Sequence, residues 1–242
     1  MQSVAAYTLW LPWQRTGHHL AKLFIDYEPG LHWSQIHRRV CLITNKTLCK
    51  LRTSDVHSKV ERGKGSGHDM ERMIVGGGCF WCVEGAYKQI RGVESALPAY
   101  AGGHDPHPTY EAVCSGTTGH AEVVEVQFDP AIVSFETLLE VFFTVHDPTQ
   151  LNRQGNDIGT QYRSCIMPLS EDQRATAEAT IADMGNVYDD PIVTTIEEPV
   201  HFLIAEKKHH DYYARNPYQG YCMAVVGPKI AKVRAKHAHL YL

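Results

Sequence analysis

The sequence predicts an α+β fold, a two-layer sandwich in which packed helices cover one mixed central sheet. From Met73 onward, short runs rich in β-branched and apolar residues alternate with segments of helical period. Their order is too irregular for a doubly wound parallel sheet, and neither GGGCFW nor YAGG has the spacing of a dinucleotide fingerprint. The composition, 43% hydrophobic and 21% charged, is that of an ordinary globular domain.

The first half of this region contains a strand, a helix and two further strands. MIVGGG (73–78) reads as a buried strand that runs into a glycine turn. The apolar spacing that follows predicts a helix that begins at or near Cys79 and stops at Gly92. Turn formers and β-branched residues predict the rest: a strand in VESALPAYAGG (93–103), a loop at HDPHPTY (104–110) and a strand in AEVVEVQFDP (121–130).

The second half alternates helix and strand. SFETLLEVFFTVH (134–146) is an amphipathic helix with Ser134 as its N-cap, and SEDQRATAEATIADMG (170–185) is a helix with an acidic first turn and a glycine end. The remaining segments are a strand in QYRSCIMP (161–168), a last strand in PIVTTIEE (191–198) and a last short helix in FLIAEKKHHDYYARN (202–216).

The first 72 residues differ from the rest in charge, with 11 Lys and Arg against 6 Asp and Glu, whereas the remainder has 12 against 21. One interpretation is a basic arm that binds nucleic acid or an acidic membrane. A second is a transit peptide. We prefer a third, an over-extended reading frame with the start at Met70 or Met73. We therefore expect residues 1–72 to be an N-terminal extension, 73–236 to form the catalytic domain and 237–242 to be a C-terminal tail.

The chain as a whole predicts a cytoplasmic protein with no nucleic-acid or membrane partner. No apolar run approaches the ~20 residues that cross a bilayer, and the opening MQSVAAYTLWLPWQR lacks the basic segment of a secretory signal. Seven cysteines, an odd number spread over 242 residues, fit reactive thiols better than a disulfide framework.

GGCFWC (77–82) places one cysteine behind two glycines and another three residues later. The glycines allow a sharp turn that leaves Cys79 at a helix N-terminus, where the helix dipole favours the thiolate and lowers the cysteine pKa. Cys82 follows one helical turn later. The alternatives are a zinc site, for which no second C-x-x-C is present, and a thioredoxin-like oxidoreductase, in which the tryptophan would precede the first cysteine.

Four motifs together resemble the A-type peptide methionine sulfoxide reductases: GGCFWC (77–82), PTYEAVCSGTTGHAEVVEV (108–126), HDPTQLNRQGNDIGTQYRS (146–164) and AEKKHHDYYARNPYQGYC (205–222). The resemblance covers residues 73 to about 234, in family order. It implies thiol-dependent reduction of methionine-S-sulfoxide, protein-bound and free, to methionine, with thioredoxin as the recycling partner and no cofactor or metal. The expected architecture is a ferredoxin-like plait.

The resemblance also assigns the site residues. It makes Cys79 the nucleophile and Glu122, in the GHAE motif, the proton donor to the sulfoxide oxygen. It gives the hydrogen-bonding and pocket roles to four aromatic residues and one acid: Tyr110 and Tyr162 on the oxygen, Asp157 in the same polar site, and Phe80 and Trp81 around the substrate methyl group.

Elementary chemistry supports the role of Glu122. A sulfoxide oxygen leaves only when it is protonated, so the site needs an acid that stays neutral near pH 7. Burial raises a glutamate pKa, and Glu122 opens the apolar run VVEV. The sequence leaves open whether the strand register turns this side chain inward or outward.

A sulfenic acid on Cys79 condenses with a nearby thiol to a disulfide and water. Cys82 is the preferred resolving cysteine because it is close along the chain. Cys222, in the NPYQGYC stretch, is the alternative or a second relay, since many family members use a cysteine there and have glycine where this chain has Cys82. The glycine-rich tail with a further cysteine, which the family's three-thiol relay uses, is missing. We expect Cys114 and Cys165 to be structural.

Overall fold

The protein is described here by a computed structural model, which covers residues 69–241. Of the expected extension, residues 1–68 therefore lie outside the described part of the chain. Its last residues do not, because the first strand, β1 (Glu71–Gly77), starts two residues before Met73. None of the helices in the described part is long and apolar enough to cross a membrane.

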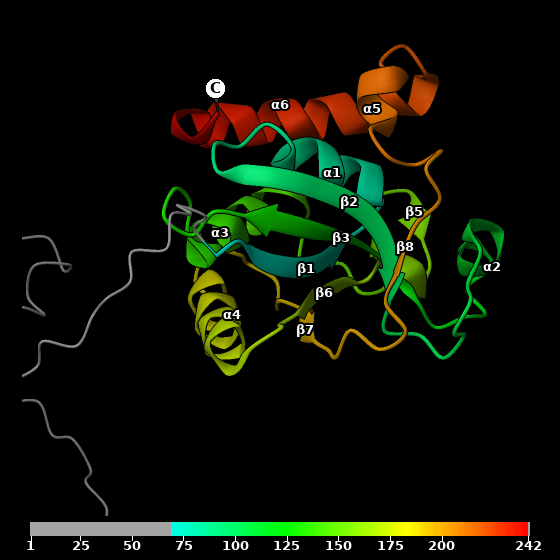
Figure 1. Cartoon of the computed structure of the whole chain (residues 1–242), viewed down its shortest axis with the longest axis horizontal. Helices are drawn as coiled ribbons and strands as arrows, with labels where there is room; N and C mark the ends of the chain where they lie inside the picture. Colours follow the sequence, from blue (N-terminus) through cyan, green and yellow to red (C-terminus); the bar gives the residue numbers. More distant parts are fainter. Residues whose placement is uncertain (1–68, 242) are drawn as a thin grey trace, which may run out of the picture. The chain divides into compact units, whose positions relative to one another are not determined.

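A six-stranded sheet forms the centre of the domain (Figure 1). Its strands, in spatial order, are β7 (Thr195–Ile196), β6 (Ser164–Met167), β1, β3 (Ala121–Phe128), β2 (Val93–Ala101) and β8 (Leu203–Ile204). Every neighbouring pair is antiparallel except β6 and β7, which are parallel, so the sheet is mixed. The four inner strands have the order of a ferredoxin-like plait, and the fold prediction is confirmed.

Three helices build the layer that covers one face of this sheet: α1 (Phe80–Tyr87), α3 (Phe135–Val145) and α6 (Gly227–Lys236). In Figure 1, α6 lies along α1, and α4 (Glu171–Met184) lies at the end of the domain near β7. The Ser134 hydroxyl accepts from the Thr137 N–H at 3.1 Å, so the predicted N-cap of α3 is confirmed. The prediction of a helix that ends at Gly185 is also confirmed, since Gly185 is the C-cap of α4.

The alternation of side chains along β3 separates two apolar regions. Val124, Val126 and Phe128 are fully buried under the helices and belong to the main core, together with side chains of α1, α3 and α6. Ala121 and Val123 point to the opposite face and belong to a smaller core. Even-numbered positions of β3 therefore face the helix layer, and this decides the direction of Glu122.

Several predicted boundaries are wrong. The first helix ends at Tyr87, because the chain then turns, and Gly92 instead supplies a left-handed residue (φ +89°) before β2. The strand predicted in 191–198 is confirmed as β7, but it is not the last, because β8 follows it. Only Tyr212–Arg215 of the expected last helix is helical (α5). The sequence analysis missed α6, whose charged residues hide a short apolar stripe.

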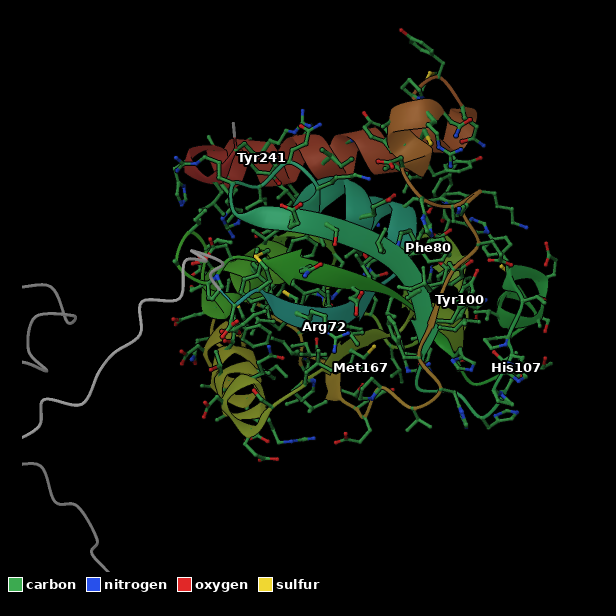
Figure 2. The ribbon with its side chains drawn as sticks, in the orientation of Figure 1. Arg72, Phe80, Tyr100, His107, Met167 and Tyr241 are labelled. Carbon is green, nitrogen blue, oxygen red and sulfur yellow. The ribbon has the colours of Figure 1, made fainter. Side chains whose placement is uncertain are left out.

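Residues 237–241 of the segment expected to be a tail, 237–242, contact the domain. Ala238–Leu240 form a 3-10 turn, and Tyr241 makes an antiparallel bridge with Ile90, just after α1. The Tyr241 hydroxyl donates to the Ala86 carbonyl at 2.7 Å, and Figure 2 shows Tyr241 beside α6. The end of the described chain thus packs against the helix that starts at the cysteine turn.

Candidate active site

A turn between β1 and α1 positions Cys79. Gly78 has φ +87°, a conformation that glycine adopts without strain, and a Cβ added there would lie 2.6 Å from the Gln154 Cβ. Cys79 follows as the N-cap of α1, with an extended backbone (φ −57°, ψ 125°). Its side chain is 6% exposed, so the sulfur is nearly buried at the entrance of the helix.

Glu122 lies directly beside this turn. Its carboxyl oxygen Oε2 accepts a hydrogen bond from the Phe80 N–H at 3.0 Å, and the residue is 1% exposed. The strand register therefore turns Glu122 inward, toward the first residue of α1. Burial raises the pKa of Glu122 to about 8, and the negative charges of Asp157 and Cys82 act in the same direction, against the Phe80 N–H. The carboxyl is mostly protonated at neutral pH, as the sequence predicts.

The prediction of a lowered pKa for Cys79 is wrong. Burial is the largest cause that raises the pKa of the Cys79 thiol well above its usual range. Its hydrogen bond with Cys82 and the negative charge of Glu122 raise this pKa further. The same hydrogen bond lowers the pKa of Cys82, against its own burial, and Lys229 lowers it further. The two thiols are thus a coupled pair, and Cys82 is its more acidic member.

The two predicted tyrosines approach the site from separate loops. Tyr110 opens the short helix α2 (Tyr110–Cys114) and stacks on Phe80, with ring centroids 6.2 Å apart. Tyr162 ends a 3-10 turn at Thr160–Tyr162. Burial raises the pKa of each hydroxyl, and the negative charge of Glu122 is the second cause in both cases. Both hydroxyls therefore stay protonated at neutral pH and lie near enough to the Glu122 carboxyl to sense its charge.

Arg163 ties the Tyr162 loop to the loop before β3. Its guanidinium makes two 2.9 Å hydrogen bonds to the Glu197 carboxylate and donates to the carbonyls of Thr160 at 3.0 Å and Gly119 at 3.2 Å. One side chain thus joins the turn that carries Tyr162 to the loop that leads into Glu122.

Asp157 lies in a small two-stranded sheet formed by β4 (Arg153–Gln154) and β5 (Asp157–Ile158). Its carboxylate accepts a hydrogen bond from the Tyr221 hydroxyl at 2.6 Å. It also contributes to the raised pKa of Glu122, which places it near the acid. A cavity of about 190 Å³ opens beside Asp157, with Val225 and Lys229 on its wall.

Phe80 and Trp81 belong to a cluster of aromatic rings. Phe80 is fully buried, and its ring centroid lies 5.9 Å from that of Tyr100, beside which Figure 2 shows it. Trp81 is partly exposed and stacks face to face on Tyr212, with centroids 3.8 Å apart and an interplanar angle of 7°. The Trp81 indole N–H is buried and has no hydrogen-bond partner among the described residues.

The sequence analysis missed four residues of this cluster. His209 packs between Phe80 and Tyr110, 5.3 and 4.3 Å from their centroids, and Glu206 accepts from the Tyr100 hydroxyl and the Tyr110 N–H. The other two are Tyr212, which covers Trp81, and Tyr221, which binds Asp157. All four lie in the motif 205–222, whose dense histidine and tyrosine content was the signal that could have found them.

Cys222 belongs to the same main core as Cys79 and Cys82. It is fully buried and begins a π-helical turn, Cys222–Val226, that continues into α6. The negative charge of Cys82 raises the pKa of Cys222, second to burial, so these two sulfurs are also neighbours. The Cys165 thiol is fully buried in the sheet, and its pKa is raised to about 12.

Cys114 is partly exposed on α2 and lies beside the Tyr110 hydroxyl. All five cysteines of the described region are free. Within residues 69–241, no group of three or more His, Cys, Asp and Glu side chains is placed to hold a metal ion.

Known proteins resemble this chain over the same region. Residues 71–241 match the family model described as peptide methionine sulfoxide reductase. The chain is 53% identical to the peptide methionine sulfoxide reductase MsrA of Chromobacterium violaceum over 173 residues, 71% of this chain and 98% of that protein. It is 52% identical to the protein of the same name from Polynucleobacter asymbioticus, over 71% of this chain and 91% of that protein.

Two solved structures share the fold. Mxr1 from Saccharomyces cerevisiae in reduced form has a TM-score of 0.60 and 32% identity, over 65% of this chain and 91% of that chain. Methionine sulfoxide reductase A of Corynebacterium diphtheriae has a TM-score of 0.57 and 34% identity, over 66% of this chain and 80% of that chain.

Proposed function

This chain belongs to the peptide methionine sulfoxide reductase family and is an oxidoreductase, and we propose that it reduces methionine-S-sulfoxide, protein-bound and free, to methionine. The observation that carries the proposal is the hydrogen bond from the Phe80 N–H to Glu122, which puts a mostly neutral carboxylic acid beside the cysteine that precedes Phe80. A nucleophilic sulfur and a proton donor at one helix entrance are what deoxygenation of a sulfoxide requires.

The first step transfers oxygen from the substrate to Cys79. The Cys79 sulfur attacks the sulfoxide sulfur while Glu122 delivers its proton to the oxygen. The protonated oxygen then moves to the Cys79 sulfur as the new S–S bond and the S–O bond of the substrate break, so that the thioether leaves as methionine and Cys79 becomes a sulfenic acid. The sulfoxide is reduced by two electrons, and the Cys79 sulfur is oxidised by two.

The proton on Cys79 must leave as the new bond forms. Cys82 already accepts the hydrogen bond from Cys79 and is the more acidic thiol of the pair. We therefore route this proton from Cys79 to the Cys82 thiolate. The negative charge that starts on Cys82 ends on Glu122, so the charge of the site does not change during the step.

The surrounding side chains hold the substrate. Phe80 and Trp81 give an apolar surface for the methyl group, and burial of such groups is worth about 25 cal/mol per Å². Tyr110 and Tyr162, whose hydroxyls stay protonated, donate to the sulfoxide oxygen. Asp157 fixes the Tyr221 hydroxyl and, by its charge, helps to keep Glu122 neutral.

Cys82 then resolves the sulfenic acid. Its sulfur displaces the hydroxyl group from Cys79, which leaves as water, and a Cys79–Cys82 disulfide forms. Cys222, which neighbours Cys82, can take over by attack on that disulfide. Thioredoxin, a dithiol reductant that the family resemblance implies, returns the cysteines to thiols. We place this cycle in the cytoplasm, where such reductants keep cysteines reduced.

The test is an assay of the two epimers of a methionine sulfoxide peptide with dithiothreitol as the reductant. The S epimer should be consumed and the R epimer left, and Cys79→Ser should abolish the reaction. Loss of neither epimer overturns the proposal. Reduction of insulin disulfides without any sulfoxide turnover would instead indicate a general disulfide oxidoreductase.

A further inference from the structure

Glu84 is a buried acid that the proposed reaction does not use. It lies on α1, three positions after Trp81 and on the same side of the helix, and is 1% exposed. Glutamate is rarely buried to this extent without specific partners. Burial raises the pKa of Glu84 to about 7, and the N–H groups of Asp211 and Tyr212 oppose this shift as hydrogen-bond donors.

The partners of Glu84 are at a strained turn. Its oxygen Oε1 accepts from the Asp211 N–H at 2.6 Å, and Lys88, one helical turn later on α1, pairs with the carboxylates of both Glu84 and Asp211. Asp211 has φ +54°, a left-handed conformation that few residues other than glycine, asparagine and aspartate adopt. Contacts from α1 therefore stabilise this left-handed turn.

This turn separates two aromatic residues of the site. Tyr212, the next residue, stacks on Trp81 at 3.8 Å, and His209, two residues before, lies 4.3 Å from Tyr110. A change of φ at Asp211 would rotate both rings away from their partners. Glu84 contacts this turn through the backbone N–H groups of Asp211 and Tyr212, and so it acts on the rings through the backbone.

We propose that Glu84 is a positioning residue for the substrate pocket. Its carboxyl accepts the hydrogen bond from the Asp211 N–H, stabilises the left-handed turn there and so holds Tyr212 against Trp81. This rests on the proposed function, in which Trp81 contacts the substrate methyl group. Loss of the acceptor oxygen should weaken substrate binding and leave the chemistry at Cys79 and Glu122 in place.

The test compares two variants that keep the side-chain volume. Glu84→Gln retains one acceptor oxygen, whereas Glu84→Leu retains none. Glu125→Gln and Glu125→Leu are matched controls, because Glu125 is a half-buried carboxylate that pairs with Arg72 on the opposite face of the sheet. The full-length proteins are assayed with the S-sulfoxide peptide and dithiothreitol, and 5-fluorotryptophan at Trp81, assigned through Trp81→Phe, gives a fluorine resonance that reports the stacking.

We expect Glu84→Leu to raise KM about tenfold and to change kcat less than about twofold, as loss of a buried backbone hydrogen bond implies. The Trp81 resonance should shift or broaden. Glu84→Gln and both Glu125 variants should stay within about threefold of the wild-type KM, with an unshifted resonance. Asp211→Gly, added to Glu84→Leu, should restore much of the binding, because glycine adopts φ +54° without strain.

An unchanged KM and resonance in Glu84→Leu overturn the proposal, as does a Glu84→Gln protein that is as impaired as Glu84→Leu. If Glu84→Leu does not fold, Glu84→Gln decides, because a moved Trp81 resonance in that protein contradicts the acceptor role. Failure of the wild-type chain to reduce any sulfoxide removes the proposed function, while the resonance still tests whether Glu84 sets the stacking.

Discussion

Glu122 combines two properties at the scale of one residue. The Phe80 N–H fixes its position, and burial raises its pKa to about 8. The sequence indicated the raised pKa, because burial of a glutamate at the start of VVEV costs free energy unless the carboxyl has a partner or a role. The direction of the side chain was open and came only from the register of β3 against its neighbours.

The role of Glu122 as the acid predicts a pH profile. Sulfoxide reduction should fall as the pH rises through about 8, because the carboxyl then loses the proton that it donates. Glu122→Gln should slow the first step by roughly 10²–10⁴-fold, which single-turnover kinetics with the S-sulfoxide peptide measures. Alkylation of Cys79 by iodoacetamide should proceed in this variant, and equal reduction rates for the two proteins would remove Glu122 from the mechanism.

The order of the three neighbouring thiols predicts which cysteine resolves. Cys82→Ser should lose only one thiol in a rapid single turnover, because the hydrogen-bonded partner of Cys79 is gone. Cys222→Ser should still lose two. Counting free thiols with a chromogenic reagent decides between them, and the reverse pattern would assign the first disulfide to Cys222.

At the scale of an element, the turn from β1 into α1 does what its glycines predict. The helix begins where the sequence analysis placed it, because a left-handed residue ahead of an extended N-cap is written into GGC. The short elements were harder to predict. β7 and β8 have two residues each, and their pairing with β6 and β2 depends on sheet edges that no local pattern describes.

Gly78 and Gly155 give a matched test of this turn. Both have a positive φ, +87° and +63°, but a Cβ at Gly78 would strike Gln154, whereas a Cβ at Gly155 meets nothing within 4 Å. Gly78→Ala should therefore lower the free energy of unfolding by about 1–3 kcal/mol more than Gly155→Ala. Urea titrations followed by circular dichroism measure the difference, and equal losses would show that backbone strain alone limits position 78.

At the scale of the whole molecule, the residues that follow α6 contact the residues that follow α1. Residues expected as a tail contact the loop after α1, through the bridge between Ile90 and Tyr241 and a hydrogen bond from the Arg91 N–H to the Leu240 carbonyl at 2.8 Å. This segment, HAHLYL, is too short to show a helical or strand period, so a sequence window gives no sign of the contact. Only the tertiary fold brings positions separated by about 150 residues together.

A truncation tests this contact. Removal of residues 238–242 should lower the unfolding midpoint by several degrees, since the Tyr241 ring and its hydrogen bond to Ala86 are lost. Tyr241→Phe, which removes only the hydroxyl, should lose about 1 kcal/mol. Differential scanning calorimetry measures both, and a truncated protein with wild-type stability would mean that the segment is a tail in solution.

The buried carboxyl of Glu122 predicts how the free energy of unfolding depends on pH. The folded-state pKa of Glu122 is raised from 4.5 to about 8, so the folded state binds more protons than the unfolded state between these values. Its contribution to stability is therefore fully present below about pH 4.5 and is lost as the pH rises to about 8. The free energy of unfolding of the wild type should fall more between pH 5 and pH 8 than that of Glu122→Gln, by an amount on the order of a few kcal/mol. Parallel pH slopes in thermal melts would contradict the buried, protonated acid.

The sequence by itself determined the elements whose signals are local: the glycine turn, the capped helix α3, the apolar strands and, through four motifs, the family and its candidate residues. Only the tertiary structure decided which way Glu122 points, which thiol of the pair is the more acidic, and which distant rings cover Trp81. The physical reason is the separation along the chain over which each interaction acts. Backbone preference and periodicity act over a few residues, whereas burial, charge and stacking depend on neighbours that the chain brings in from far away.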